Sequence, residues 1–370
     1  MNRFYPVSQP SITESEVAYV SDAVRSGWVS SIGKYVDEFE RGFARFCGTE
    51  YALATCNGTT ALHLALTSLG IKPGDEVIVP DFTFVATANA VTYTGAKAVT
   101  VDIDERTLCI DPKSLERAIT PRTRAVIPVH VYGHPADMAA INGIAESRGL
   151  FVIEDAAEAH GAEYRGRKVG ALGDCGVFSF YGNKIITSGE GGMITTNNRE
   201  LYRHARHLRD HAMSAERKYW HTELGYNYRI TNLQAALGLA QLERIDALLD
   251  KRRTMVGWYR ASLGANPRLR CNAETRGVTN AYWMFCLEIE GLTEEKRSEL
   301  MRRLLQAGVD SRPYFCPISD MPMYPRAVTP VAHRIASTGI NLPSYFDLEP
   351  HDVQFICDAV RRNLAGMALL

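Results

Sequence analysis

The sequence predicts an α/β protein in which a mostly parallel central sheet is flanked by helices and is followed by a smaller α+β domain. Between residue 51 and about 200, segments that are apolar almost throughout alternate with segments of helical periodicity. Strands of that kind are typical of parallel sheets that helices cover on both faces. A long helical stretch then leads into a different mixture of strands and helices. We therefore assign residues 1–250 to a large domain and residues 251–370 to a small C-terminal domain.

Two helices are predicted before the sheet begins. Thr13 and Glu16 have the spacing of a capping box, and Gly27 is a suitable stop for the helix that they open. The apolar face of this helix consists of Val17, Val20 and Val24. The second helix, in VDEFERGFARFCG, carries an aromatic stripe that is more typical of core packing than of a cofactor site: Phe39, Phe43 and Phe46.

The strands of the sheet are expected at 75–80, 96–104, 124–133 and 150–157. Between them lie the helical segments GTTALHLALTSLG, ATANAVTYTG, DPKSLERAIT and DMAAINGIAESRG. A long helix over 231–264, capped by Thr231, is predicted to link the two domains. The C-terminal part shows strands in AYWMFCLEIEG and VDSRPYF, a helix in EEKRSELMRRLLQAG and a last helix near 349–364.

Composition and charge argue against several classes of function. The 370 residues are 46% hydrophobic and carry a formal net charge of −1, which gives no sign of a nucleic-acid partner. The chain has neither the apolar core of a signal peptide nor a run of about eighteen apolar residues, so we expect a cytoplasmic protein without a membrane span. The eight cysteines include no CxxC pair and no cluster with histidine, so no metal site is expected.

The segment SFYGNKIITSGEGGM places Lys184 between two apolar, strand-like runs. Three glycines follow it, which indicates a bend where the backbone comes close to another group. One interpretation is an exposed lysine in a hairpin turn. The other is an amine nucleophile in a pocket, where partial removal from water keeps the amine neutral enough to attack a carbonyl. This segment alone does not decide between them.

A second feature is the helix start in CNGTTALHLAL. The residues Asn57, Gly58, Thr59 and Thr60 are small or carry hydroxyl groups, and a helix start of this kind presents free N–H groups to a phosphate. The spacing of a P-loop is absent, so a nucleoside triphosphate is not the expected ligand. The alternative is an ordinary helix cap.

A third feature is Asp155, which ends the apolar strand in VIEDAAEAHG. A buried carboxylate needs a cationic partner, and the protonated ring nitrogen of pyridoxal phosphate is one such partner. The alternative is an acid that caps a helix or bonds to the backbone. If Ser179 faces the same phosphate as the helix start, Lys184 can reach the aldehyde of that cofactor. In this order along the chain, the three features together indicate pyridoxal 5′-phosphate.

The chain also resembles a known family, the sugar-nucleotide aminotransferases of fold type I. The matching runs cover most of residues 1–345: WVSSIGKYVDEFE, NGTTALHLAL, GDEVIVPDFTFVATANAV, VIPVHVYGHPADM, VIEDAAEAHGA, GDCGVFSFYGNKIITSGEGGMI, GYNYRITNLQAALGLAQLE and GINLPS. Within the family, SFYGNKIITSGEGGM, HVYGHPADM, RKYWHTELGYNYR and SRPYF resemble most the subgroup that makes GDP-perosamine. The resemblance implies the fold type I architecture.

By resemblance, Lys184 is the catalytic lysine that bonds to the cofactor, and Asp155 faces the pyridine nitrogen. The same comparison assigns the remaining cofactor contacts to the phosphate (Gly58, Thr59 and Ser179), the ring face (Phe84), the ring oxygen (Glu158) and the phosphate of a neighbouring subunit (Asn227). We expect four further residues to contact the substrate: Ser31, Asn183, Arg229 and Tyr314. Cys316 stands where many relatives have histidine, a departure that concerns the sugar contacts.

The implied reaction transfers an amino group from L-glutamate to C4 of a nucleotide-linked 4-keto-6-deoxy sugar. The favoured substrate is GDP-4-keto-6-deoxy-D-mannose, and a homodimer with shared active sites is expected. An alternative is a keto-sugar linked to UDP or dTDP. Relatives that act as sugar 3-dehydratases carry histidine in place of the catalytic lysine, which Lys184 argues against. A regulatory protein without catalysis is disfavoured because Asp155, Ser179 and Lys184 are all present.

Overall fold

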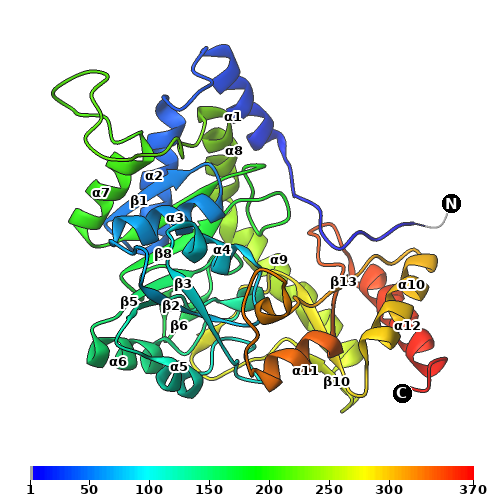
Figure 1. Ribbon diagram of the computed structural model, residues 1–370. Coiled ribbons are helices and arrows are strands. Elements are labelled where there is room, and N and C mark those ends of the chain that lie inside the picture. The colour runs from blue at the N-terminus through cyan, green and yellow to red at the C-terminus, as the bar shows by residue number, and fades with distance from the viewer. Residues whose placement is uncertain (1–2) are drawn as a thin grey trace.

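The computed structural model describes residues 3–370, and its N-terminal two thirds are built around a seven-stranded sheet (Figure 1). The strand order is β1-β9-β8-β5-β4-β2-β3. Four neighbouring pairs are parallel, and only β9 runs against its neighbours β1 and β8. The strands are β1 (Tyr51–Thr55), β2 (Glu76–Pro80), β3 (Lys97–Val101), β4 (Thr123–Val126), β5 (Phe151–Asp155), β8 (Cys175–Ser179) and β9 (Gly192–Thr196). The predicted, mostly parallel sheet is confirmed.

Helices cover both faces of this sheet, as the apolar strands require. Neighbouring residues of β2 alternate between two hydrophobic clusters, with Val77 and Val79 in one and Ile78 in the other. One cluster includes residues of α3 (Gly58–Ser68), α4 (Ala86–Tyr93) and α7 (Arg199–Arg209). The other includes residues of α2 (Lys34–Cys47), α5 (Pro112–Ala118), α6 (Met138–Arg148), α8 (Asn232–Glu243) and α9 (Ile245–Leu263). Phe39 and Phe43 are fully buried there, as predicted.

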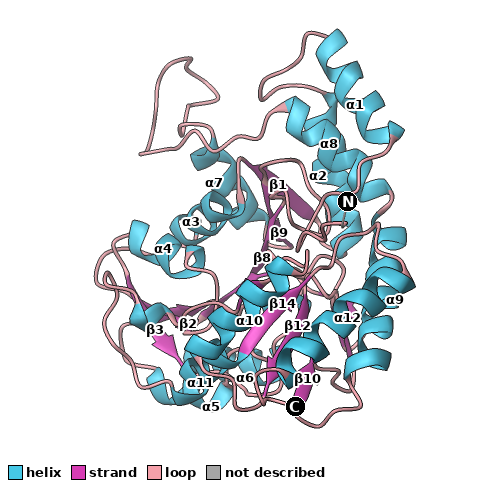
Figure 2. Cartoon of the chain, turned by 90° about the vertical axis from the view of Figure 1, so that its right-hand side faces the viewer, coloured by secondary structure: helices cyan, strands magenta, loops and turns pink. Residues whose placement is uncertain are grey.

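The first helix has the predicted cap but a different environment. Thr13 and Glu16 form the capping box of α1 (Glu14–Arg25). Val17 and Val24, however, are 51% and 55% exposed, so most of the predicted apolar face is not packed within this chain. Helix α1 stands at one end of the molecule, near α2 and α8, and the segment between α7 and α8 projects from the same end (Figures 1 and 2).

The long helix predicted over 231–264 is two helices, which corrects the expectation. Thr231 caps α8 through a capping box with Gln234, as predicted. Arg244 then leaves helical geometry, with φ −112° and ψ 11°, and α9 begins at the next residue. Its guanidinium reaches Glu16 at 2.8 Å, and the bond ties the break to α1. Helix α9 runs past residue 250, the position at which we divided the chain.

The C-terminal part forms a second, antiparallel sheet with its own hydrophobic cluster (Figure 2). Its strands are β10 (Leu269–Cys271), β12 (Phe285–Ile289), β14 (Gly339–Leu342) and β13 (Arg312–Pro313), in that order. The helices here are α10 (Glu294–Gln306), α11 (Pro330–Thr338) and α12 (Pro350–Ala365). The strand predicted in VDSRPYF is reduced to two residues, and β14, β10 and α11 were not predicted. The ring of Tyr259 on α9 stacks on Phe285 at 4.1 Å between centroids.

Short elements complete the chain. A three-stranded sheet of β11 (Val278–Thr279), β6 (Glu163–Tyr164) and β7 (Arg167–Lys168) joins the two parts, and two 3-10 turns are η1 (Val131–Gly133) and η2 (Ile318–Asp320). No helix within residues 3–370 combines the length and apolar character that crossing a bilayer requires. Over the same residues, histidine, cysteine and acidic side chains form no group of three that could hold a metal ion.

Candidate active site

A cavity of about 520 Å³ opens at the carboxyl ends of the parallel strands, next to the start of α3. Ligands of open α/β sheets bind at this edge. Eight of the residues that the sequence singled out line this one cavity: Gly58, Thr59, Phe84, Asp155, Glu158, Ser179, Asn183 and Lys184. They come from four separate segments of the chain, which the sheet brings together.

Lys184 lies inside this cavity, on the loop that connects β8 to β9. Its side chain is only 10% exposed, which excludes the interpretation of an exposed lysine in a turn. The Nζ atom lies 3.8 Å from a carboxylate oxygen of Glu158 and 3.9 Å from the centre of the Trp283 ring. Burial lowers the pKa of Lys184, and the nearby carboxylates of Glu158 and Asp155 oppose this effect. The neutral amine that a nucleophile requires is therefore favoured.

Glu158 is the nearest acidic neighbour of Lys184. It is 4% exposed and accepts a hydrogen bond from the backbone N–H of Tyr132 at 2.8 Å. Burial raises the pKa of Glu158 to about 7, although Lys184 and the Tyr132 bond act in the opposite direction. Both members of the pair are thus shifted toward their neutral forms, so a proton can pass into or out of this site near neutral pH.

Asp155 ends β5 at the floor of the cavity and is 5% exposed. Its carboxylate accepts hydrogen bonds from the Thr87 hydroxyl at 2.8 Å and from the Ala157 N–H at 3.2 Å. Burial raises the pKa of Asp155, and none of the ion pairs among residues 3–370 includes it. A cationic group placed against this carboxylate would relieve the unfavourable burial of its charge. The protonated ring nitrogen of the predicted cofactor has this property.

The start of α3 fits a phosphate group. Asn57 caps the helix by accepting the Thr60 N–H at 2.8 Å, and the cap leaves the amides of Gly58 and Thr59 free to bind an anion. A Cβ atom at Gly58 would lie 2.9 Å from the Cβ of Ser179. Glycine at this position therefore lets the helix start and the end of β8 approach each other closely. The Ser179 hydroxyl lies on the same wall of the cavity.

Asn183 and several aromatic residues line the rest of the wall. The Oδ1 atom of Asn183 is buried without a hydrogen-bond partner, which leaves it free for a ligand. Phe84 is 58% exposed, and its ring centroid lies 6.2 Å from that of Phe315. Trp283 donates a hydrogen bond from its ring nitrogen to the backbone carbonyl of Asn183 at 2.8 Å, next to Lys184.

Tyr314 does not reach the cavity, contrary to our expectation. It is 3% exposed, and its ring packs against Gly339 so closely that a Cβ there would overlap it. Its neighbours Arg312 and Phe315 line the cavity instead. The segment SRPYF does contribute to the wall of the cavity, but a two-residue strand gives no periodicity from which to tell which side chain faces inward. Trp283 carried no local signal of any kind.

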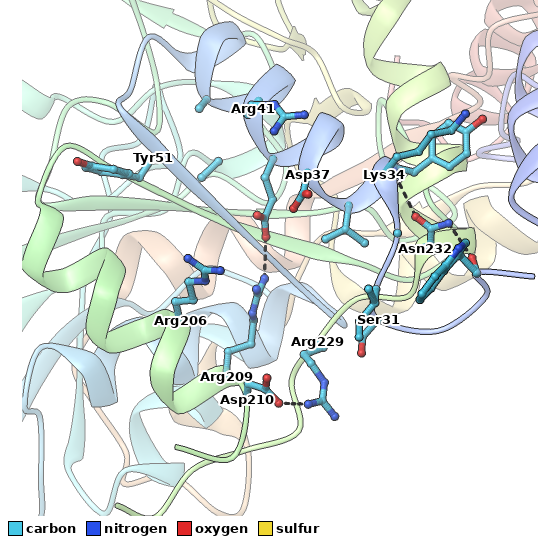
Figure 3. A pocket seen from close by; sticks show the side chains of 18 of the residues that line it. Ser31, Lys34, Asp37, Arg41, Tyr51, Arg206, Arg209, Asp210, Arg229 and Asn232 are labelled. Carbon is cyan, nitrogen blue, oxygen red and sulfur yellow. Dashed lines mark hydrogen bonds and ion pairs between the residues drawn. The ribbon is translucent and has the colours of Figure 1, made fainter. Parts of the chain in front are cut away.

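Ser31 and Arg229 lie elsewhere, in a second cavity of about 1010 Å³ (Figure 3). This cavity is bounded by α2, the end of α7 and the segment that precedes α8, and it also contains Arg206 and Arg209. Arg229 bonds to Asp210 and donates to the side chain of Asn227 at 2.9 Å. Three predicted site residues, Ser31, Asn227 and Arg229, are therefore outside the cavity that holds Lys184 in the same chain.

Comparisons with known proteins agree with this geometry. Residues 10–361 match the model of the DegT/DnrJ/EryC1/StrS aminotransferase family. The chain is 47% identical to a GDP-perosamine synthase from Caulobacter vibrioides and 44% identical to one from Escherichia coli O157:H7. Each alignment covers 97% of this chain and 98% of the relative. The resemblance to sugar aminotransferases that the motifs indicated is confirmed.

Solved structures show the same architecture. The crystal structure of 3-amino-5-hydroxybenzoic acid synthase superposes with a TM-score of 0.93 at 32% identity, over 99% of this chain and all of that one. The PLP form of a candidate sugar aminotransferase from Streptococcus pneumoniae gives a TM-score of 0.94 at 29% identity, with 99% and 100% covered. The predicted fold class is confirmed.

Proposed function

Because this chain belongs to the DegT/DnrJ/EryC1/StrS aminotransferase family, we propose that it aminates C4 of GDP-4-keto-6-deoxy-D-mannose, with L-glutamate as donor, to give GDP-perosamine. The chain is an aminotransferase, and its cofactor is pyridoxal 5′-phosphate. The observation that carries the proposal is the buried Lys184 beside Asp155 and the free start of α3. The choice of a GDP-linked sugar rests on three relatives of 40–47% identity that are named GDP-perosamine synthase.

The residues of the cavity fit this cofactor. The Gly58 and Thr59 amides and the Ser179 hydroxyl would hold its phosphate, Asp155 its ring nitrogen and Phe84 one face of its ring. When bound, pyridoxal phosphate supplies an electron-withdrawing ring that stabilises negative charge at the α carbon of the donor. Lys184 Nζ is the base that removes the proton from that carbon, and burial, which lowers the pKa of Lys184, favours the neutral amine that this role needs. Glu158, with its pKa raised to about 7, can exchange a proton with Lys184 between steps.

The two alternatives are weaker on specific grounds. A sugar 3-dehydratase of this family would carry histidine at the position of Lys184. A keto-sugar linked to UDP or dTDP would use the same cofactor contacts, so it is distinguished only by experiment.

We also propose that two copies of the chain share their active sites. Ser31, Asn227 and Arg229 lie outside the cavity of their own chain, and the surface beside them exposes large apolar side chains. These are Val17, Val24, Trp28, Ile32, Tyr219, Trp220 and Leu224. An apolar surface of this kind is typical of an interface. In a homodimer, Asn227 of one copy would reach the cofactor phosphate of the other, and Arg229, which donates to Asn227, would orient it.

The test is to incubate the purified, cofactor-loaded protein with L-glutamate and with 4-keto-6-deoxy sugars linked to GDP, UDP or dTDP in turn. Mass spectrometry of the products should show replacement of the keto oxygen by an amino group with the GDP-linked sugar. The Lys184→Ala variant is the matched control and should give no amination. Amination of only the UDP- or dTDP-linked sugar would refute the choice of nucleotide, and removal of the 3-hydroxyl without amino transfer would refute the reaction.

A further inference from the structure

Arg312 brings a guanidinium group to the wall of the cavity that holds Lys184. The ionisable side chains of that wall are three acids, Asp155, Glu158 and Glu190, and two cations, Lys184 and Arg312. Arg312 lies on β13, opposite Asn341 of β14, and is exposed. Within the described part of the chain, no acid pairs with it and no hydrogen bond engages its guanidinium.

Three other arginines of the C-terminal part behave differently. Arg334 pairs with Glu105 and Glu288, and Arg270 pairs with the same two acids. Arg297, on α10, is buried and donates to the carbonyl of Ala336. The guanidinium groups of these three arginines are thus engaged by ion pairs or hydrogen bonds within the protein. Arg312 has no such role, which leaves its five donors available to a ligand.

The backbone that carries Arg312 is firmly placed. The N–H of Tyr314 donates to the carbonyl of Gly339 at 3.2 Å, and the N–H of Phe315 donates to the Tyr132 hydroxyl at 3.3 Å. The ring of Phe315 also stacks on that of Tyr132, with 5.1 Å between centroids and 13° between planes. The buried Tyr314, which we had expected to touch the substrate, thus anchors the segment that presents Arg312.

The other charged residues of the cavity offer few positive partners to an anionic substrate. Lys184 is assigned to the cofactor, and burial favours its neutral amine, so it offers no permanent positive charge to an incoming substrate. Arg312 is then the one permanent cation among the lining residues, against three acids. Both substrates of the proposed reaction are anionic, since the donor carries carboxylates and the acceptor carries a diphosphate. A free guanidinium binds either group through two parallel hydrogen bonds.

We propose that Arg312 is the anion-binding residue of this cavity, and that it holds the carboxylate of the amino donor or the diphosphate of the sugar nucleotide. The inference rests on the proposed function for the identity of these anions. The position of the guanidinium does not depend on it.

The experiment compares the native chain with Arg312→Gln and Arg312→Lys, all loaded with cofactor. Arg302→Gln is the matched control, because Arg302 is an exposed arginine of α10 that pairs with Glu299 away from the cavity. Calorimetry measures the binding of glutarate, an unreactive dicarboxylate, and of GDP. Cofactor absorbance then follows the two half-reactions separately, first with L-glutamate and then with the keto-sugar.

We expect Arg312→Gln to weaken one of these ligands by roughly 10- to 100-fold, as loss of a charge-assisted bidentate contact does. The affinity of Arg312→Lys should lie between those of Arg312→Gln and the native chain, because lysine keeps the positive charge but lacks the two parallel N–H donors of the guanidinium. Weaker glutarate binding, together with a higher half-saturating concentration of L-glutamate in the first half-reaction, identifies the donor carboxylate as the ligand. Weaker GDP binding, together with a higher half-saturating concentration of the keto-sugar in the second half-reaction, identifies the diphosphate as the ligand.

The proposal is overturned if neither ligand is weakened by Arg312→Gln, or if Arg302→Gln weakens binding equally. A rate loss without any change in ligand affinity overturns it too. Failure of the proposed function is a separate result. In that case L-glutamate would change the cofactor absorbance of the native chain, but the GDP-linked sugar would not be aminated. The glutarate measurement still tests Arg312 in that case.

Discussion

Replacing Glu158 by glutamine should stabilise the cofactor-free protein at pH 8 and leave its stability at pH 5 nearly unchanged. Burial raises the pKa of Glu158 to about 7 in the folded chain, from an ordinary value of 4.5. Between pH 4.5 and about pH 7, the carboxyl group of Glu158 therefore stays protonated in the folded chain but has lost its proton in the unfolded chain. The free energy of unfolding is higher at low pH and falls as the pH rises from 4.5 to about 7.

The size of the effect follows from the two pKa values. They differ by about 2.5, and each unit corresponds to about 1.36 kcal/mol, so the native chain loses about 3 kcal/mol across this pH range. Glutamine keeps an oxygen for the Tyr132 N–H but cannot ionise, so it avoids this loss. For a chain of 370 residues, 3 kcal/mol corresponds to about 4 °C in Tm.

Thermal melting of both proteins at pH 5 and pH 8, without cofactor, measures this difference. The Glu290→Gln variant is the control, because Glu290 is exposed at the end of β12 and outside the cavity. We expect the Glu158→Gln variant to melt about 4 °C above the native chain at pH 8 and close to it at pH 5. The same difference at both pH values, or a lower Tm at pH 8, would refute the argument that a buried carboxylate opposes folding there.

Lys184→Ala should abolish amino transfer, and borohydride should fix the cofactor to Lys184 in the native chain; a label on Lys168 would contradict this. Asp155→Asn should reduce turnover by about 100-fold while the fold survives, because the ring nitrogen loses its buried anionic partner. Native-like turnover would show that Asp155 is only structural. Gly58→Ala should weaken cofactor binding by roughly tenfold, since the added Cβ meets Ser179 at 2.9 Å; absorbance titration measures this, and unchanged affinity would show that the helix start can shift. Mixed dimers of Lys184→Ala and Asn227→Asp chains should recover part of the activity, because one of their two sites carries neither change. No recovery in a verified mixed dimer would count against shared sites.

The sequence predicted the large sheet well because each of its elements has a strong local pattern. Strands that are buried on both faces are apolar throughout, and capping residues such as Thr13 and Thr231 set the starts of their helices. The gathering of Asp155, Gly58 and Lys184 around one cavity was predictable for the same reason. Asp155 ends β5, Gly58 begins α3 and Lys184 lies on the loop after β8, so the topology of the sheet places them at one edge.

The errors arose where long-range packing decides the outcome. Arg312 and Trp283 reach the cavity from the C-terminal part of the chain. Arg312 lies on a two-residue strand, and no local pattern indicates which side of such a strand faces inward. At the break between α8 and α9, Arg244 forms an ion pair with Glu16, a residue far away in the sequence that no local pattern connects with it. For Val17 and Val24 the helical periodicity was right, but periodicity does not tell which surface covers the apolar face.

The hydrogen bond from Trp283 to the carbonyl of Asn183 has a consequence for how the protein can be divided. It joins a residue that precedes β12 to the loop of Lys184, which belongs to the first sheet. A fragment that ended near residue 250 would keep the strands and the start of α3 but would lose this contact to the loop of Lys184. The two sheets are separate units of packing, yet the chemistry belongs to neither alone. Exchange of the C-terminal part between relatives would therefore change a hydrogen-bonded neighbour of the Lys184 loop together with the residues that this part adds to the cavity, which are Trp283, Arg312 and Phe315.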